Sequence, residues 1–224
     1  SDVDDFFSPL GSVTAKVKGS YSVQCYHEAL EGALLDHVSR LGTSVKEVLG
    51  GADMFVLHVP FRNMAYNALA RIMTNYLGLD GEELESYLRA RGFQQSIEPS
   101  TRVGNIYSGS AYMALSFLLS ERHDSLGDGI VGKKVLIASY GSGNTMTVLQ
   151  GRVEDGAPEV ISGWNIADVP EAGREVRFDE YDRWIRGAES PEAYATEVEA
   201  SEIPAGSFYL ASIREDGYRE YSFK

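Results

Sequence analysis

The chain has 224 residues, of which 43% are hydrophobic and 24% are charged, so it can bury a sizeable core in one large domain or two small ones. Its net charge of −13 would repel nucleic acid and anionic lipid, and we expect neither as a partner. The single cysteine, Cys25, excludes an internal disulfide and offers no thiolate cluster for zinc or iron.

The sequence also bears on the compartment. No stretch approaches the roughly 20 apolar residues that a membrane span needs, and the opening residues are acidic where a secretory leader would be basic and then apolar. We therefore expect a cytoplasmic protein without a membrane span. Because residue 1 is Ser and not Met, we expect that the chain begins inside a longer gene product or after processing.

The first half of the chain alternates helical and strand patterns. Apolar residues recur at helical spacing over 22–41, and Gly42 supplies a stop, which predicts a long amphipathic helix. The apolar run at 53–57 follows two glycines and predicts a strand buried on both faces. A helix should follow it directly, with Pro60 in its first turn and Gly78 at its end.

Two further helices are predicted over 82–91 and from about 110 to 119. The second is hydrophobic over most of its circumference and should therefore be central. Between them lies the polar segment 94–104. The run 135–138 predicts another buried strand, which a glycine-rich turn separates from an antiparallel return over 145–153.

The C-terminal region is polar and rich in Glu over 163–206, with a small helix predicted around 178–185. Two strands at 208–213 and 218–223 flank an Asp-Gly pair, which is the strongest short signal for a hairpin. Buried strands that alternate with helices predict an α/β layered architecture, in which helices cover a mixed sheet.

His58 directly follows a buried strand and precedes the predicted helix that starts near Pro60. Ligands of α/β proteins gather at the carboxyl ends of strands, and an imidazole there can donate a hydrogen bond to a developing oxyanion or act as acid and base near neutral pH. A hydrogen-bonded core histidine would occupy the same position. From position alone, both interpretations stay open.

Two polar turns offer further candidates. Asn105 lies in a glycine-flanked turn that opens onto the most apolar helix, where its amide could bond a thioester carbonyl or a water, or could cap the helix. The turn at 139–144 exposes backbone N–H groups that can hold an oxyanion or a carbonyl, although a plain hairpin turn is the alternative. It lacks the lysine of a phosphate-binding loop and the spacing of a dinucleotide fingerprint or a serine nucleophile elbow.

Other reactive side chains fit structural roles better. Cys25 falls inside the first amphipathic helix with no base beside it in sequence, which predicts a buried structural cysteine. His27 and His37 share that helix but lie too far apart to bind one metal ion, and His123 is expected in a charged loop. We therefore expect no metal site.

Three strings, in the same order, resemble the histidine, asparagine and glycine-serine motifs of the hydroxymethylglutaryl-coenzyme A (HMG-CoA) synthases: HVPF (58–61), VGNIYSGS (103–110) and SYGSG (139–143). The flanks DFFSP (5–9), YSVQCYHEAL (21–30) and FYLASIREDGYREYSF (208–223) are also similar to segments of that family. The resemblance covers nearly the whole chain and is weakest over about 154–207.

This resemblance implies a thiolase-like layered fold in which residues 1–224 form the C-terminal half and the N-terminal half is absent. It also implies a Claisen-type condensation. A cysteine carries an acetyl group, a glutamate removes a methyl proton, the enolate attacks a β-ketoacyl thioester, and hydrolysis frees the product. Cysteine and glutamate belong to the family's N-terminal half, so we expect no condensation by this chain alone. The implied substrates are coenzyme A thioesters, with no tightly bound cofactor.

The resemblance also assigns roles to individual residues. His58 would polarise the acceptor carbonyl, and Asn105 would position the acceptor thioester. Gly141 and Ser142 would orient the acyl groups with backbone and hydroxyl donors, and Tyr107 would line the same pocket.

One departure leaves the acceptor open. Many family members that use free coenzyme A carry a lysine at the position of Asn63, where Arg62 would have to serve as the cation from a different direction on the helix. The acceptor is therefore either acetoacetyl-CoA or a β-ketoacyl group on an acyl-carrier protein, as in polyketide β-branching. A non-catalytic partner subunit is the third hypothesis. The implied partner is an N-terminal thiolase-like half, on a separate chain or on the same polypeptide, and we expect dimers of such pairs.

Overall fold

The structure is a computed structural model, and it describes residues 3, 5, 10, 11, 14, 16–141, 144–166, 168–171, 173, 175–188 and 203–224. The chain divides into two compact units, residues 1–172 and residues 173–224, and each is described by itself. The sheet in the first unit has three strands, and the sheet in the second has two.

The larger sheet is mixed. Its strands, in spatial order, are β1 (Met54–Leu57), β2 (Lys134–Gly141) and β3 (Thr145–Arg152). β1 runs parallel to β2, with Met54 opposite Val135 and Leu57 opposite Ala138, and β3 returns antiparallel to β2. The predicted buried strands and the antiparallel return are confirmed.

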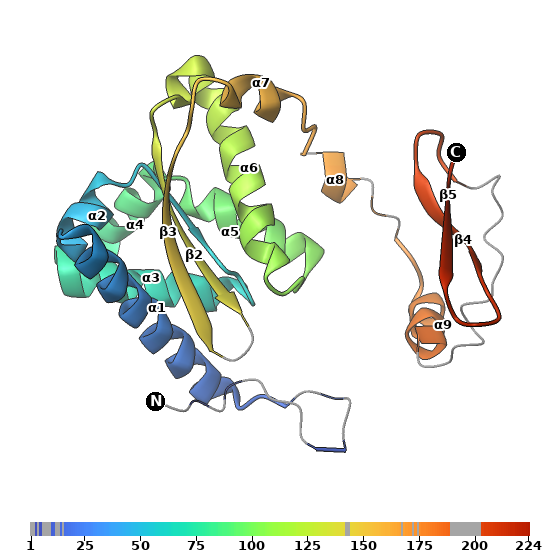
Figure 1. Cartoon of the computed structure of the whole chain (residues 1–224). Coiled ribbons are helices and arrows are strands. Elements are labelled where there is room, and N and C mark those ends of the chain that lie inside the picture. The colour runs from blue at the N-terminus through green and yellow to red at the C-terminus, as the bar shows by residue number, and fades with distance from the viewer. Residues whose placement is uncertain are drawn as a thin grey trace. The chain divides into compact units, whose positions relative to one another are not determined.

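Helices pack around this sheet (Figure 1). They are α1 (Gly19–Leu41), α2 (Val45–Gly51), α3 (Arg62–Leu77), α4 (Gly81–Ala90), α5 (Phe93–Val103), α6 (Gly109–Leu126), the 3-10 helix η1 (Gly127–Ile130) and α7 (Ala157–Ser162). The short helix α8 (Asp168–Glu171) follows them in the chain. In the part of the chain that the structure describes, no helix combines the length and the apolar character needed to cross a membrane.

The side chains of β1 belong to two hydrophobic cores, one on each face of the sheet. Phe55 and Leu57 pack with residues of α1 to α5, whereas Met54 and Val56 pack with residues of α6, η1 and α7. All four side chains are at most 2% exposed. Because successive strand residues point to opposite faces, a strand covered on both faces must be apolar throughout. The predicted layered α/β architecture is therefore confirmed.

The predicted helices are confirmed with differences at their ends. Gly42 and Gly78 adopt the left-handed conformation after α1 and α3, with φ of 65° and 71°, as helix-terminating glycines do. Pro60 lies before α3 and not in its first turn, because Phe61 occupies the N-cap position. α6 continues beyond the predicted end to Leu126, so the prediction of a charged loop around His123 is wrong and His123 lies in the helix.

The sequence pattern does not predict α5 or α2. α5 forms although its sequence is polar and contains Pro99, because Phe93 and Ile97 are 0% and 2% exposed and belong to the larger core. Burial of this narrow stripe outweighs the weak helix propensity of the segment. α2 begins with a capping box, in which Ser44 and Glu47 each accept a hydrogen bond from the other's backbone N–H.

The turn between α4 and α5 requires a glycine. Gly92 has φ of 70°, and a Cβ on it would lie 2.4 Å from the side chain of Leu118 in α6. Any larger residue would therefore be strained in its backbone and would also collide with α6. This close approach holds α5 against α6, and the loop between these two helices contributes to the site described below.

The second unit contains α9 (Phe178–Ala188) and the strands β4 (Phe208–Ile213) and β5 (Arg219–Phe223). β4 and β5 pair in antiparallel register, from Phe208 opposite Phe223 to Ile213 opposite Arg219. Gly217 takes φ of 83° in the connecting turn, a conformation that glycine adopts without strain. The predicted hairpin and the predicted small helix are confirmed.

Candidate functional site

The parallel pairing of β1 and β2 brings their carboxyl ends to the same edge of the sheet. The backbone N–H of His58, the first residue after β1, donates to the Ala138 carbonyl at 2.7 Å and so prolongs the pairing. β2 ends at Gly141 on that edge. Ligands of α/β sheets bind at such edges.

His58 is held from three sides and is only 6% exposed. The hydroxyl of Tyr26 in α1 donates to its backbone carbonyl at 2.7 Å. Its ring atom Nδ1 lies 2.9 Å from Oγ of Ser110 at the start of α6. Burial lowers the pKa of the His58 imidazole from 6.5 to about 4, because the cation loses its hydration there. The ring is therefore neutral at physiological pH.

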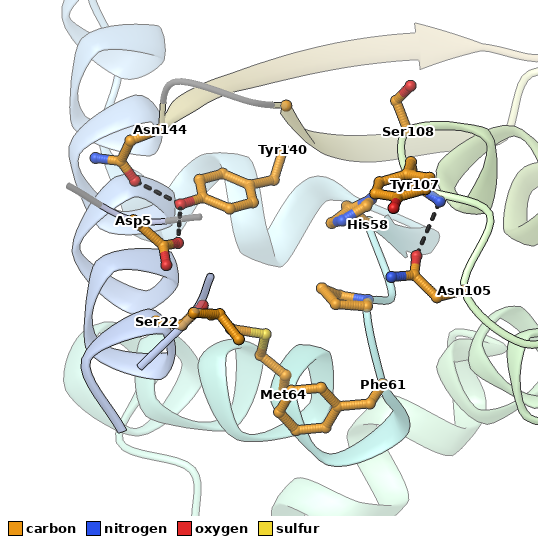
Figure 2. A pocket seen from close by; sticks show the side chains of 13 residues that line it. Asp5, Ser22, His58, Phe61, Met64, Asn105, Tyr107, Ser108, Tyr140 and Asn144 are labelled. Carbon is orange, nitrogen blue, oxygen red and sulfur yellow. Dashed lines mark hydrogen bonds between the residues drawn. The ribbon is translucent and has the colours of Figure 1, made fainter. Parts of the chain in front are cut away.

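Asn105 and Tyr107 lie in the exposed loop between α5 and α6. Oδ1 of Asn105 accepts a hydrogen bond from the backbone N–H of Tyr107 at 2.8 Å, which closes a local turn. Figure 2 shows the amide nitrogen of Asn105 on the side of the cavity. Tyr107 has φ of 54°, a left-handed conformation uncommon for a residue with a Cβ. The side chain of Asn105 thus orders this loop and does not cap α6.

A third group of polar side chains was not singled out by the sequence patterns. The hydroxyl of Tyr140 in β2 lies 2.7 Å from Oδ2 of Asp5 and 2.6 Å from Oδ1 of Asn144. Because a hydroxyl has one proton, it donates to one of these oxygens at a time. Burial, followed by the hydrogen bond to Asp5, raises the pKa of Tyr140 well above its usual value of 10. Tyr140 lies inside the SYGSG string and Asp5 opens DFFSP, so both strings contained the signal.

These three groups surround one cavity of about 270 Å³. Figure 2 shows His58 between Tyr140 and the Asn105–Tyr107 loop, with Phe61 and Met64 of the segment around the start of α3 nearby. The remaining lining residues are Val17, Ser22, Pro60, Ser108 and Gly141. A neutral imidazole, an amide and a hydroxyl around a largely apolar space are the kind of groups that bind and polarise a small carbonyl compound.

Four of the residues singled out from sequence, His58, Asn105, Tyr107 and Gly141, line this cavity together. Ser142 lies outside the described residues, as do 6–9 of the DFFSP string. Arg62 and Asn63 are exposed at the start of α3 and line a separate polar recess with Tyr66, Glu85 and Arg89, among others.

The other reactive side chains do not form a second site among the described residues. Cys25 is 3% exposed in α1, which confirms the prediction of a buried cysteine. Among the described residues, no group of three or more His, Cys, Asp or Glu side chains is placed to hold a metal ion.

Comparison with known proteins gives consistent results. The family described as "Hydroxymethylglutaryl-coenzyme A synthase C terminal" matches residues 86–224. The hydroxymethylglutaryl-CoA synthase of Gibberella zeae is 26% identical over 267 residues, which cover 98% of this chain and 58% of that protein. The synthase of Enterococcus faecalis is 29% identical over 155 residues, which cover 69% of this chain and 37% of that protein. The chain thus spans about half the length of the curated relatives that it matches over almost all of its own.

Solved structures resemble the chain along its whole length. MvaS in complex with 3-hydroxy-3-methylglutaryl coenzyme A is 27% identical with a TM-score of 0.73, and the match covers 100% of this chain and 55% of that one. The HMG synthase of the curacin biosynthetic pathway, in complex with holo donor-ACP, is 19% identical with a TM-score of 0.81 over 100% of this chain and 55% of that one. The second likeness is one of fold alone. The predicted thiolase-like fold is confirmed.

Proposed function

The chain belongs to the hydroxymethylglutaryl-coenzyme A synthase family, whose C-terminal region it matches, and we propose that it forms the acceptor-binding half of such an enzyme. The complete enzyme condenses an acetyl group with acetoacetyl-CoA to 3-hydroxy-3-methylglutaryl-CoA. The nucleophilic cysteine and the general-base glutamate come from an N-terminal half, on another chain or another part of the same polypeptide.

The observation that carries this proposal is the convergence of three distant segments on one cavity. His58 follows β1, Asn105 precedes α6 and Gly141 ends β2, and all three line the same space of about 270 Å³. Each of them belongs to one of the three strings that resemble the family's motifs. If His58 were only a core histidine and 139–144 only a hairpin turn, nothing would require both to line one cavity with the amide of Asn105.

His58 stabilises the charge that develops on the acceptor. When an enolate carbon attacks the β-carbonyl of the acceptor, the new C–C bond forms as the carbonyl π electrons move onto oxygen. A neutral imidazole N–H directed at that oxygen stabilises the oxyanion without having to give up its proton first. The lowered pKa of His58 and its position at the strand end both suit this role.

Asn105 positions the acceptor thioester. Its Oδ1 is occupied by the backbone N–H of Tyr107, so the side chain can rotate little and its NH₂ group keeps one direction. A fixed amide donor holds a thioester carbonyl in the orientation that the attack requires. The left-handed Tyr107 follows from the same turn and places its ring at the edge of the cavity.

Reconstitution with the cognate N-terminal half tests the proposal. The purified chain alone should form no HMG-CoA, and the combined halves should form it from acetyl-CoA and acetoacetyl-CoA, as followed by mass spectrometry. In the combined halves, His58→Ala should lower kcat by about 10²–10³, the cost of one oxyanion donor. His123→Ala, the same change near the end of α6 outside the cavity, is the matched control. Acetyl transfer to the N-terminal cysteine should survive both changes.

Two results would contradict the proposal. Condensation that is indifferent to changes at His58 and Asn105 would assign the chain to a non-catalytic partner role. Absence of acetyl transfer and condensation in a stable complex of both halves would exclude the family reaction for this pair.

A carrier-linked acceptor is the second candidate, and the start of α3 favours it. Asn63 has no charge, and the guanidinium of Arg62 lies 3.9 Å from the carboxylate of Glu98, so part of its charge is already compensated. An acceptor on acyl-carrier protein depends less on a cation at this position. Turnover should be compared on acetoacetyl-CoA and on acetoacetyl-carrier protein, and equal or better use of free coenzyme A would exclude this version.

A further inference from the structure

Ser110 connects the two segments that frame the cavity, although it does not line the cavity itself. It lies in the first turn of α6 and is fully buried, with 0% of its surface exposed. Its Oγ accepts the backbone N–H of Val59 at 3.0 Å and lies 2.9 Å from Nδ1 of His58. One hydroxyl therefore contacts the histidine ring and the peptide that follows it.

The proton of this hydroxyl decides the state of the ring. The N–H of Val59 already occupies a lone pair of Oγ and fixes the orientation of the serine. In the described part of the chain, Nδ1 of His58 is the acceptor within hydrogen-bonding distance of this hydroxyl. If Nδ1 carried the proton instead, the serine hydroxyl would be buried with no acceptor, which costs about 1–3 kcal/mol. The arrangement with Ser110 as donor is therefore favoured.

We propose that Ser110 is a positioning residue, which holds His58 as the neutral tautomer protonated on Nε2, so that the ring offers an N–H donor to the cavity. The hydroxyl of Ser110 donates to Nδ1, and Nε2 is the nitrogen left for a ligand. The ring cannot offer a lone pair to a ligand in this state, so it cannot remove a proton from one.

The surroundings of the ring support a neutral imidazole. Tyr26 of α1 contacts the backbone carbonyl of His58, and Tyr140 of β2 has its ring centroid 6.1 Å from that of His58. The carboxylate of Asp5, which also lines the cavity, lies within hydrogen-bonding distance of the Tyr140 hydroxyl. Burial alone accounts for the lowered pKa of His58.

The tautomer itself does not depend on what the enzyme makes, whereas its consequence for catalysis rests on the proposed function. If His58 stabilises an oxyanion, the Nε2 proton must be present before the substrate arrives, and Ser110 supplies that condition. Removal of a methyl proton creates the enolate, and a group other than His58 must accept that proton. This agrees with a general base in the N-terminal half.

Nitrogen NMR of the chain with ¹⁵N-labelled histidine tests the tautomer directly. His58→Gln identifies the signals of His58 among the four histidines. We expect a pyrrole-type signal for Nε2 and a pyridine-type signal for Nδ1 in the unchanged chain. Ser110→Ala should move both signals toward the average of two tautomers. Ser116→Ala, in the same helix, should leave them unchanged, because its hydroxyl donates to the Tyr112 carbonyl and not to His58.

Kinetics of the reconstituted halves provide the second readout. Ser110→Ala should lower kcat about tenfold or more with little change in KM. The acceptor still binds, but in part of the molecules His58 is then protonated on Nδ1 and offers no N–H donor on Nε2. Ser110→Thr, which keeps the hydroxyl, should recover most of the Nε2 tautomer and of kcat.

A pyrrole-type Nδ1 in the unchanged chain would overturn the proposal, and this measurement needs no variant to fold. Unchanged His58 signals in Ser110→Ala would overturn it as well. If the halves show no condensation while the unchanged chain has the expected tautomer, the proposed function fails and the role of Ser110 in the ring state stands.

Discussion

The two walls of the cavity are held in place in different ways (Figure 2). His58 is 6% exposed and receives hydrogen bonds or contacts from α1, β2 and α6, which are distant in sequence. Asn105 and Tyr107 are exposed, and the hydrogen bond between them is local to the loop. The His58 wall is therefore part of the core, whereas the loop wall, which Asn105 and Tyr107 form, is ordered by its own residues.

Stability and activity should therefore be coupled at the His58 wall and separable at the loop wall. A change behind His58 disturbs packing and the ring together, because protein interiors are close-packed. A change in an exposed loop alters a ligand contact at little cost to folding. Substitutions at the two walls should therefore have different effects on stability and on activity.

Removal of the core support beneath the His58 wall should have the largest effect on stability. Phe55 is 0% exposed in β1, three residues before His58. Phe55→Ala should lower the free energy of unfolding by about 3–5 kcal/mol, since it leaves a cavity in the core. Urea unfolding measures this loss. Phe178→Ala, at a side chain that is 78% exposed, is the control and should stay within about 0.5 kcal/mol.

Removal of a single oxygen behind His58 tests the coupling more finely. Tyr26→Phe deletes the hydroxyl that donates to the His58 carbonyl and should cost about 1–3 kcal/mol of unfolding free energy, because the buried carbonyl loses this donor. Tyr112→Phe, at a tyrosine that is 71% exposed, is the matched control. A loss equal to that of the control would mean that the His58 wall is not coupled to the core through this bond.

The loop wall should respond in the opposite way. Asn105→Ala should lower the free energy of unfolding by about 1 kcal/mol or less, because it removes one exposed hydrogen bond that is local to the loop. The same change should lower condensation by the reconstituted halves about tenfold, the value of one hydrogen bond near 1.4 kcal/mol. Paired denaturation and kinetic measurements check both numbers. A large loss of stability would show that the loop belongs to the core after all.

The pH dependence of stability should single out His58. Its pKa is about 4 in the folded chain and near 6.5 when unfolded, so the unfolded chain binds more protons between these values. The contribution of His58 is fully present above about pH 6.5 and is lost as the pH falls toward 4. The difference in unfolding free energy between the unchanged chain and His58→Gln should therefore shrink as the pH falls through this window, as measured by urea titrations. A difference that stays constant over this window would contradict burial of a neutral ring.

Much of the fold could be predicted from the sequence where its determinants are local. The helix stops at Gly42 and Gly78, the apolar run of β1 and the Asp-Gly turn between β4 and β5 all lie within a few residues of the structure that they specify. α5 could not be predicted in this way, because the burial of Phe93 and Ile97 is favourable only once the core is present. Its polar sequence otherwise indicates no helix.

The candidate site shows the same division. The amino-acid sequence places a histidine after a strand and polar residues in two glycine-flanked turns, and the order of these motifs resembles one family. The chemical state of these residues depends on the fold. Asp5 and Tyr140 are separated by 135 positions, and His58 and Ser110 by 52, yet each pair is hydrogen-bonded. Burial and hydrogen bonding, which set the pKa and tautomer of a side chain, depend on such contacts between distant segments and not on its neighbours in sequence.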